Sequence, residues 1–170
     1  MTISMYQVSV PVFARNLSAL AGVLDKAAAF AEAKKFDQGV LLSTRLYPDM
    51  FPLTVQVGQV CTHAARGIAQ LSGMTQPEFA GPETTLAALK DRVLKTLEFV
   101  KSATPAQIDG TEDKDIVLKF GTREMPFKGE QFLVGFTLPN FFFHYTTAYN
   151  ILRSIGLEVG KRDFMGPPPA

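Results

Sequence analysis

Residues 140–150 read NFFFHYTTAYN and form the middle of the segment that decides the fold. Asn140 follows a proline and belongs to the residue types that cap helices, and Gly156 is a typical helix stop. The sequence therefore predicts a long helix from about 140 to 155. His144 shares one face of this helix with both polar and apolar residues, namely Asn140, Thr147, Ala148 and Ile151. A mixed face of this kind is typical of the mouth of a pocket.

Three earlier segments repeat apolar residues at steps of three and four, the pattern of a helix with one buried face. The first runs from about 4 to 35, the second opens at Pro52 and stops at Gly73, and the third follows a capping threonine at position 84 or 85. Asp37 predicts a short helix between the first two. The three apolar stripes are Phe13, Leu17, Leu20, Leu24, Ala27 and Ala31; Leu53, Val57, Val60, Ala64, Ile68 and Leu71; and Leu86, Leu89, Val93, Leu97 and Val100.

The repeat changes to a period of two between 115 and 128. DIVLKF and EMPFKG read as short strands joined by the turn GTR, which predicts a β-hairpin. The predicted fold class is therefore mainly α: an antiparallel four-helix bundle with a short β-hairpin inserted before the last long helix. A chain of 170 residues is long enough to bury one core. We expect a single domain over residues 1–170, with an extended C-terminal tail from about 157.

Charge is almost balanced, with 17 basic and 16 acidic residues and a net charge of +1. The chain therefore has no general electrostatic field for nucleic acid or an anionic membrane, and neither is expected as a partner. The hairpin is also nearly neutral, because its charged residues are Asp115, Lys119, Arg123, Glu124 and Lys128. Neither a glycine-rich phosphate loop nor a nucleophile elbow occurs in the sequence.

Cys61 is the only cysteine, so the chain has no internal disulfide, which fits a reducing compartment. It lies within an apolar helical pattern and is therefore expected to be a buried, inert thiol. The first residues lack the basic start and continuous apolar run of a signal peptide. No segment offers about 18 uninterrupted apolar residues, the length that a membrane span requires. We therefore expect a cytoplasmic protein.

The loop RLYPDMFP, residues 45–52, places two charged side chains among apolar ones. Arg45 and Asp49 have two open interpretations. They form a structural ion pair that pins the loop, or they belong to a site, because loops carry function more often than their share of residues.

The segment GKRDF, residues 160–164, adds a second charged set in the tail. It is either a solvated tail anchored by Phe164 or a lid that folds back over one end of the bundle. Tyr6 would face the same end, because antiparallel packing would bring the start of the first helix near the end of the fourth.

The chain contains two histidines, His63 and His144. His144 has three open interpretations: a buried neutral side chain with one hydrogen bond, a residue of an unliganded pocket, or a metal ligand. We expect it inside the bundle near one end, in a pocket lined by Phe and Tyr that faces the RLYPDMFP loop. Its hydrogen-bond partner would be Thr147, Asn140 or a group of that loop. His63 falls off the apolar stripe, which predicts a solvated or bundle-flank position.

Four stretches together resemble a known family: SMYQVSVPVFARNL, RLYPDMFPLTVQV, LPNFFFHYTTAYNILR and GKRDFMG. The chain is similar through them to a bacterial domain of unknown function within the DinB/YfiT-like superfamily of four-helix bundles. The resemblance covers nearly the whole chain. It implies a DinB-like bundle that is often dimeric, so a homodimer is expected, with no established activity for this branch.

The wider superfamily is associated with metal-dependent enzymes, and its typical signature is one histidine on the second helix and two histidines four apart on the fourth. Here the residues four positions from His144 are Asn140 and Ala148, so three imidazoles are not available. A set of His144, His63 and Asp49 could still hold a divalent metal such as zinc or nickel. Because the signature is incomplete, no bound metal or other cofactor is expected.

Three candidate functions follow from these observations. The first is binding of a small molecule in a pocket near His144, with Asp49, Arg45, Tyr149 and Tyr6 as further pocket residues. The alternative is a non-catalytic dimerisation or interaction module. A second alternative is a divalent-metal-dependent enzyme with a degenerate histidine site. The sequence assigns no catalytic residue.

Overall fold

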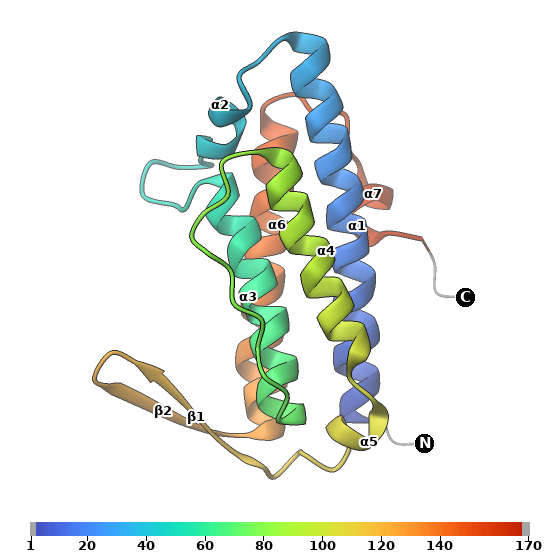
Figure 1. Cartoon of the computed structure of the whole chain (residues 1–170), viewed down its shortest axis with the longest axis vertical. Helices are drawn as coiled ribbons and strands as arrows, with labels where there is room; N and C mark the ends of the chain where they lie inside the picture. The colour runs from blue at the N-terminus through green and yellow to red at the C-terminus, as the bar shows by residue number, and fades with distance from the viewer. Residues whose placement is uncertain (1–2, 168–170) are drawn as a thin grey trace.

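The computed structural model describes residues 3–167, and four long helices in it pack as a bundle. They are α1 (Met5–Lys34), α3 (Leu53–Ser72), α4 (Leu86–Ser102) and α6 (Leu138–Ser154). α1 packs along α4, and α3 packs along α6. Figure 1 shows α1 and α6 running in one direction and α3 and α4 in the other, so both pairs are antiparallel. The predicted four-helix bundle is confirmed.

The chain between α3 and α4 determines these directions. Residues 73–85 cross the length of the bundle, so α4 starts at the same end as α3 (Figure 1). α1 and α6 consequently run parallel to each other, and the start of α1 lies at the opposite end of the bundle from the end of α6. The expectation that placed Tyr6 beside the end of the last helix is therefore wrong. Tyr6 instead donates its backbone N–H to Asp109, at 2.8 Å.

Side chains satisfy free backbone groups at the starts of α1 and α4. Ser4 accepts from the backbone N–H of Gln7, and the Gln7 side chain accepts from the N–H of Ser4, which makes a capping box at α1. Thr85 accepts from the N–H of Ala88 at the start of α4. Gly73 ends α3 at φ 79°, a left-handed conformation that costs glycine little.

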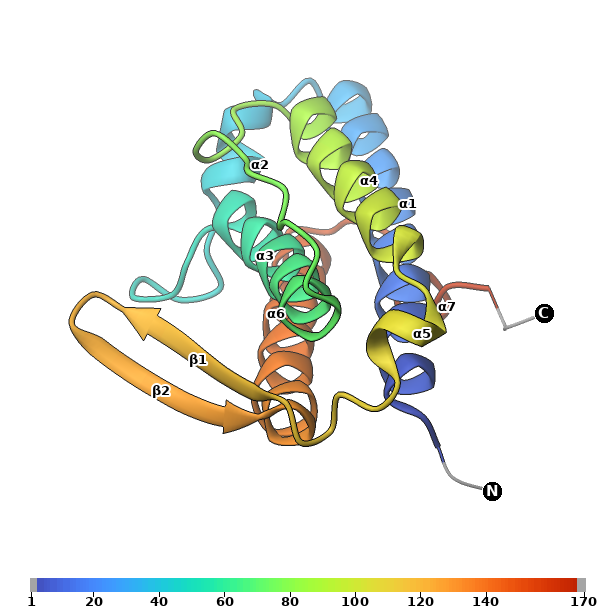
Figure 2. The ribbon, with the colours of Figure 1, turned by 60° about the horizontal axis from the view of Figure 1, so that its bottom comes forward.

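Shorter elements shape the two ends of the bundle. They are α2 (Gln38–Ser43), α5 (Pro105–Ile108), β1 (Asp115–Phe120), β2 (Arg123–Lys128), the π-helix η1 (Gln131–Thr137) and α7 (Lys161–Met165). β1 and β2 pair in antiparallel register with Phe120 opposite Arg123, so the predicted hairpin is confirmed. Figure 2 shows the hairpin extending outward on the side of α3 and α6.

The hairpin joins the bundle at Gly129, where two backbone segments pass too close for a side chain. A Cβ at this position would collide with the carbonyl oxygen of Thr111. The next residue, Glu130, donates its N–H to the carbonyl oxygen of Glu112 at 2.9 Å. These contacts fix where the hairpin leaves the bundle and so hold it beside α3 and α6.

The start of α6 differs from the prediction. The helix begins at Leu138 and continues directly from η1, so residue 140 is not a free helix start. Asn140 therefore does not cap the helix, and its side-chain Nδ2 donates to the carbonyl oxygen of Phe136 at 2.7 Å. A proline followed by asparagine is typical of a helix start, but here Pro139 lies in the first turn of α6, just after η1.

The tail after α6 is not extended throughout, because α7 forms within it and packs along α1. Phe164 stacks on Tyr145 with ring centroids 4.3 Å apart, and Tyr145 donates its hydroxyl to the carbonyl oxygen of Phe164 at 2.7 Å. Asp163 pairs with Lys26 of α1 at 2.7 Å. Of the two interpretations of this segment, the structure shows the anchor at Phe164. The segment packs along the side of α1 and forms no lid over the end of the bundle.

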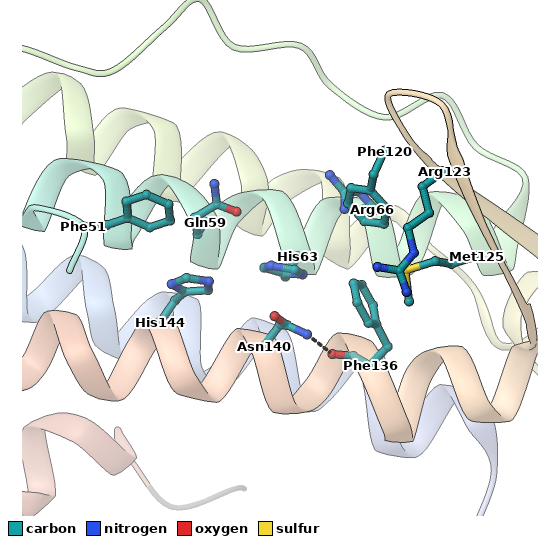
Figure 3. Close-up of a pocket in the computed structure, with 10 residues that line it drawn as sticks. All are labelled: Phe51, Gln59, His63, Arg66, Phe120, Arg123, Met125, Phe136, Asn140 and His144. Atoms are coloured by element: carbon teal, nitrogen blue, oxygen red, sulfur yellow. Dashed lines mark hydrogen bonds between the residues drawn. The ribbon is translucent and has the colours of Figure 1, made fainter. Parts of the chain in front are cut away.

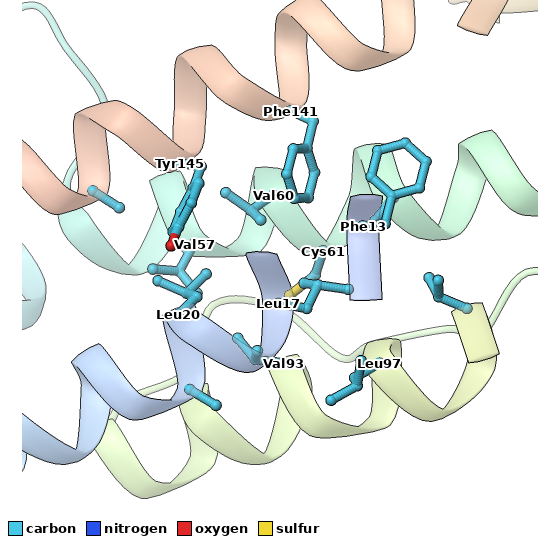
Figure 4. Packing of buried hydrophobic residues seen from close by; sticks show 14 of the residues in the cluster. Phe13, Leu17, Leu20, Val57, Val60, Cys61, Val93, Leu97, Phe141 and Tyr145 are labelled. Atoms are coloured by element: carbon cyan, nitrogen blue, oxygen red, sulfur yellow. The ribbon is translucent and has the colours of Figure 1, made fainter. Parts of the chain in front are cut away.

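Apolar side chains from all four long helices fill the centre of the bundle (Figure 4). Phe13 packs edge-on against Phe141 with ring centroids 4.9 Å apart, and both are fully buried. Burial of each such ring contributes about 1.5–3 kcal/mol. Cys61 is buried in the same core as predicted, and burial raises the pKa of its thiol to about 11. Among residues 3–167, no helix combines the length and apolar character needed to cross a membrane.

Candidate functional site

A cavity of about 500 Å³ lies between α3, α6 and the hairpin. This volume is in the range of small-molecule sites, about 300–1,000 Å³. Figure 3 shows the residues that line it: Phe51, Gln59, His63, Arg66, Phe120, Arg123, Met125, Phe136, Asn140 and His144. Three phenylalanines and a methionine form the apolar part of the wall, and six residues with polar side chains converge on the same space. This composition is typical of a binding site.

Helical spacing brings these side chains together. Gln59, His63 and Arg66 are three or four residues apart and therefore share one face of α3. On the facing helix, Asn140 and His144 are four apart and share one face of α6. The hairpin bounds one end of the cavity and the loop before α3 bounds the other, so two helices and two connections define the site.

His144 is buried, as predicted, with 8% of its surface exposed. Its Nδ1 lies 2.7 Å from Oε1 of Gln56, and Nε2 of Gln56 donates to the carbonyl oxygen of Phe51 at 3.1 Å. Because a carbonyl oxygen can only accept, the amide nitrogen of Gln56 has to face Phe51, and its oxygen has to face His144. Nδ1 of His144 therefore carries the proton.

This hydrogen-bond chain leaves Nε2 of His144 as a bare lone pair. Within residues 3–167, Nε2 has no hydrogen-bond partner. This nitrogen is open to solvent, so a ligand in the cavity can reach it. The predicted partners bond elsewhere, since Asn140 donates to Phe136 and Thr147 donates to the carbonyl oxygen of Phe143. The actual partner, Gln56, links the imidazole to the RLYPDMFP loop through the carbonyl oxygen of Phe51.

His63 contradicts the prediction of a solvated or flanking position, because only 6% of its surface is exposed. Its ring lies 5.5 Å from that of His144, with the planes within 15° of parallel, and 5.9 Å from Phe136. Burial, then the neighbouring His144 and Arg66, lower its pKa to about 4. The prediction failed because α3 packs against both α4 and α6, so its buried face is wider than the main apolar stripe.

A second hollow of about 260 Å³ lies on the other side of His144. Asp49 lines it together with His144, so the structure brings these two predicted site residues together. Burial lowers the pKa of His144, the direction expected for an apolar pocket. Phe51 lines both hollows and stacks on His144 with ring centroids 6.5 Å apart.

The residues present do not make a complete metal site. His63 and His144 stack beside each other in the cavity wall, but Asp49 lines the second hollow and not this cavity. No group of three or more histidine, cysteine, aspartate or glutamate side chains in the described part of the chain is placed to hold an ion. A protein zinc site normally has three or four such ligands.

Three other predicted site residues lie outside the main cavity. Arg45 donates to the carbonyl oxygen of Met50 and, in the described residues, forms no ion pair with Asp49. Tyr149 donates its hydroxyl to the carbonyl oxygen of Val159 at 3.3 Å and so holds the tail. Tyr6 lies in the first turn of α1 and is not among the residues that line the cavity. Arg45 therefore holds the loop through a backbone carbonyl, whereas the ion pair with Asp49 that one of its two interpretations proposed is not formed among the described residues.

Sequence reasoning missed two cationic residues of the cavity, Arg66 and Arg123. Arg66 lies over the ring of Phe120, with its Cζ 6.0 Å from the ring centroid. The available signal was the three-residue step from His63 to Arg66, which puts both on one face of α3. The role of Arg123 depends on how the hairpin is placed beside α3 and α6, which the sequence does not specify.

The bundle with its crossover between α3 and α4, and the facing polar side chains of α3 and α6, define a DinB-like helical bundle protein. The chain is similar to a DinB family member protein from Shewanella denitrificans, whose crystal structure matches with a TM-score of 0.85 and 38% sequence identity. The match covers 97% of this chain and 93% of that one. The family model of a domain of unknown function, DUF1993, matches residues 5–165, and the chain belongs to this family. No curated protein matches the chain.

Proposed function

We propose that this protein binds a small molecule in the cavity between α3 and α6, with Nε2 of His144 as a hydrogen-bond acceptor. The hydrogen-bond chain from Phe51 through Gln56 to His144 carries this proposal, because it fixes both the orientation and the tautomer of the ring. Burial keeps the imidazole neutral at physiological pH, so the lone pair is available to a hydroxyl or amide of a ligand.

The rest of the lining supports the same function. Phe51, Phe120 and Phe136 offer apolar surface, while Gln59 and Asn140 offer amide groups within the same cavity. A few polar groups placed in an apolar wall fix the orientation of a ligand without preventing its entry. The buried Nδ1 of His63 is a further polar atom, and it has no hydrogen-bond partner among residues 3–167.

A single tryptophan can report on binding, because the chain has none of its own. Phe51→Trp places the reporter between the two hollows, and Phe36→Trp places a control at a similarly exposed position outside both. We expect small aromatic fragments such as benzyl alcohol, benzamide and 4-hydroxybenzoate to change the emission of the Phe51→Trp protein saturably. Adding His144→Gln should weaken binding about fivefold, because one hydrogen bond is lost. Equal responses from the two tryptophan proteins would contradict the proposal.

A second candidate function, association with a second copy of the chain, is favoured by apolar side chains exposed beside the second hollow. Tyr47, Phe51 and Phe143 are 66%, 51% and 55% exposed. Phe51 and Phe143 both line the second hollow, and Tyr47 belongs to the loop that ends beside it; exposed apolar groups of this size are typical of interaction surfaces. Light scattering at micromolar concentration should give the mass of a dimer for the natural protein and of a monomer for Phe143→Lys. A monomer mass for the natural protein would contradict this candidate.

A further inference from the structure

Two arginines lie at the hairpin end of the cavity, and no described carboxylate neutralises either of them. Arg66 comes from α3 and Arg123 from β2, and both side chains line the cavity (Figure 3). In the part of the chain that the structure describes, neither forms an ion pair. None of the described residues that line the cavity is an aspartate or a glutamate. This end of the cavity therefore carries uncompensated positive charge.

The pairing of the other hairpin charges explains why Arg123 stands apart. Lys119 pairs with Glu124 at 3.0 Å, and Lys128 pairs with Asp115 at 2.7 Å. Within each cross-strand pair the two charges cancel. Arg123 is therefore the remaining positive charge of the hairpin, unpaired among the described residues. Its side chain reaches from the hairpin into the cavity (Figure 3). A hairpin that is nearly neutral by composition thus presents one cation to the site.

Arg66 is half-buried, and burial lowers the pKa of its guanidinium. Taking a cation out of water without a partner is unfavourable, and the ring of Phe120 offsets only part of this cost. The N–H groups of a guanidinium form a planar fork that fits the oxygens of a carboxylate or phosphate. An anionic ligand would therefore relieve a cost that is already present in the free protein.

We propose that the ligand is an organic anion, in which a carboxylate or phosphate on a flat apolar body lies between Arg66 and Arg123. This inference rests on the small-molecule binding proposed above. The apolar body would pack against Phe120 and Phe136, whose ring centroids are 6.4 Å apart. Since His144 lies toward the other end of the cavity (Figure 3), a hydroxyl at the far end of the ligand would donate to it.

Isothermal titration calorimetry with matched probes tests the charge of the ligand. We expect 4-hydroxybenzoate to bind at least about tenfold more tightly than 4-hydroxybenzamide, which has the same shape without the charge. Phenyl phosphate in a parallel titration distinguishes a phosphate from a carboxylate preference. Arg66→Gln and Arg123→Gln should each weaken binding of the better anion about tenfold and leave binding of the amide within about twofold. Arg66→Lys should fall between, because it keeps the charge and loses the fork.

Lys119→Gln is the matched control, since it removes one positive charge from the same hairpin outside the cavity lining. It should leave both affinities unchanged, and thermal melts should show that every variant is folded. If the amide binds as tightly as both anions, or if Arg66→Gln weakens anion and amide equally, the anion inference is wrong while the binding function stands. If no probe binds the natural protein and the Phe51→Trp reporter stays silent, both are wrong.

Discussion

The burial of His63 predicts that mild acid destabilises the protein. Its pKa of about 4 in the folded protein lies below the ordinary value of 6.5, so the unfolded chain takes up the proton first. The contribution of neutral, buried His63 to the free energy of unfolding is therefore complete above pH 6.5 and is lost as the pH falls toward 4. One pKa unit corresponds to about 1.4 kcal/mol, so the free energy of unfolding should fall by about 2 kcal/mol between pH 8 and pH 5 through His63 alone.

Urea unfolding followed by far-ultraviolet circular dichroism at four pH values from 8 to 5 measures this loss. The window is informative because the chain has only two histidines, and most carboxylates titrate below it. His63→Gln should remove about 2 kcal/mol of the pH dependence, whatever its effect on stability at pH 8. His144→Gln should leave most of it in place. If the profile of His63→Gln parallels that of the natural protein, His63 is not buried and neutral, and the geometry of the site is wrong.

Three further predictions concern other parts of the structure. Gln56→Leu leaves Nδ1 of His144 without an acceptor and should lower the free energy of unfolding by about 1–3 kcal/mol in urea titrations, whereas an unchanged value would mean that the hydrogen bond does not form. Phe164→Ala removes the ring stacked on Tyr145 and should lower the free energy of unfolding by about 2 kcal/mol. Limited proteolysis should then cleave the tail, and a tail that stays resistant would contradict the anchor. Cys61 should not react with a thiol reagent at pH 8 until urea is added, because its pKa is about 11 and it is buried, and rapid reaction of the native protein would contradict this.

Much of the fold could be predicted because local chemistry and apolar spacing agree along most of the chain. Thr85 and Gly73 bound their helices as predicted, and the hairpin follows the change of period. The start of α6 could not be predicted in this way. The π-helix before it carries no periodic signal of its own, and the Pro139–Asn140 pair imitates a helix start.

The candidate site was predictable only in part. His144 and Asp49 could be placed near each other because their segments were expected to meet at one end of the bundle. Tyr6 was misplaced because the direction of α1 relative to α6 depends on a crossover whose path is a tertiary property. Tyr149 lies five residues after His144 on α6 and therefore on a different face of the helix, where its hydroxyl donates to the tail. Arg123 was missed because a nearly neutral composition does not say which charges pair across the strands.

The tautomer of His144 tests the central claim most directly. A long-range ¹H–¹⁵N spectrum of the uniformly labelled protein at pH 7.5 contains imidazole signals from only two histidines, and His63→Gln assigns them. If Gln56 orients the ring as described, the spectrum should show His144 neutral, with the proton on Nδ1 and a bare Nε2 available to a ligand. A proton on Nε2, or a charged ring at this pH, would contradict the account.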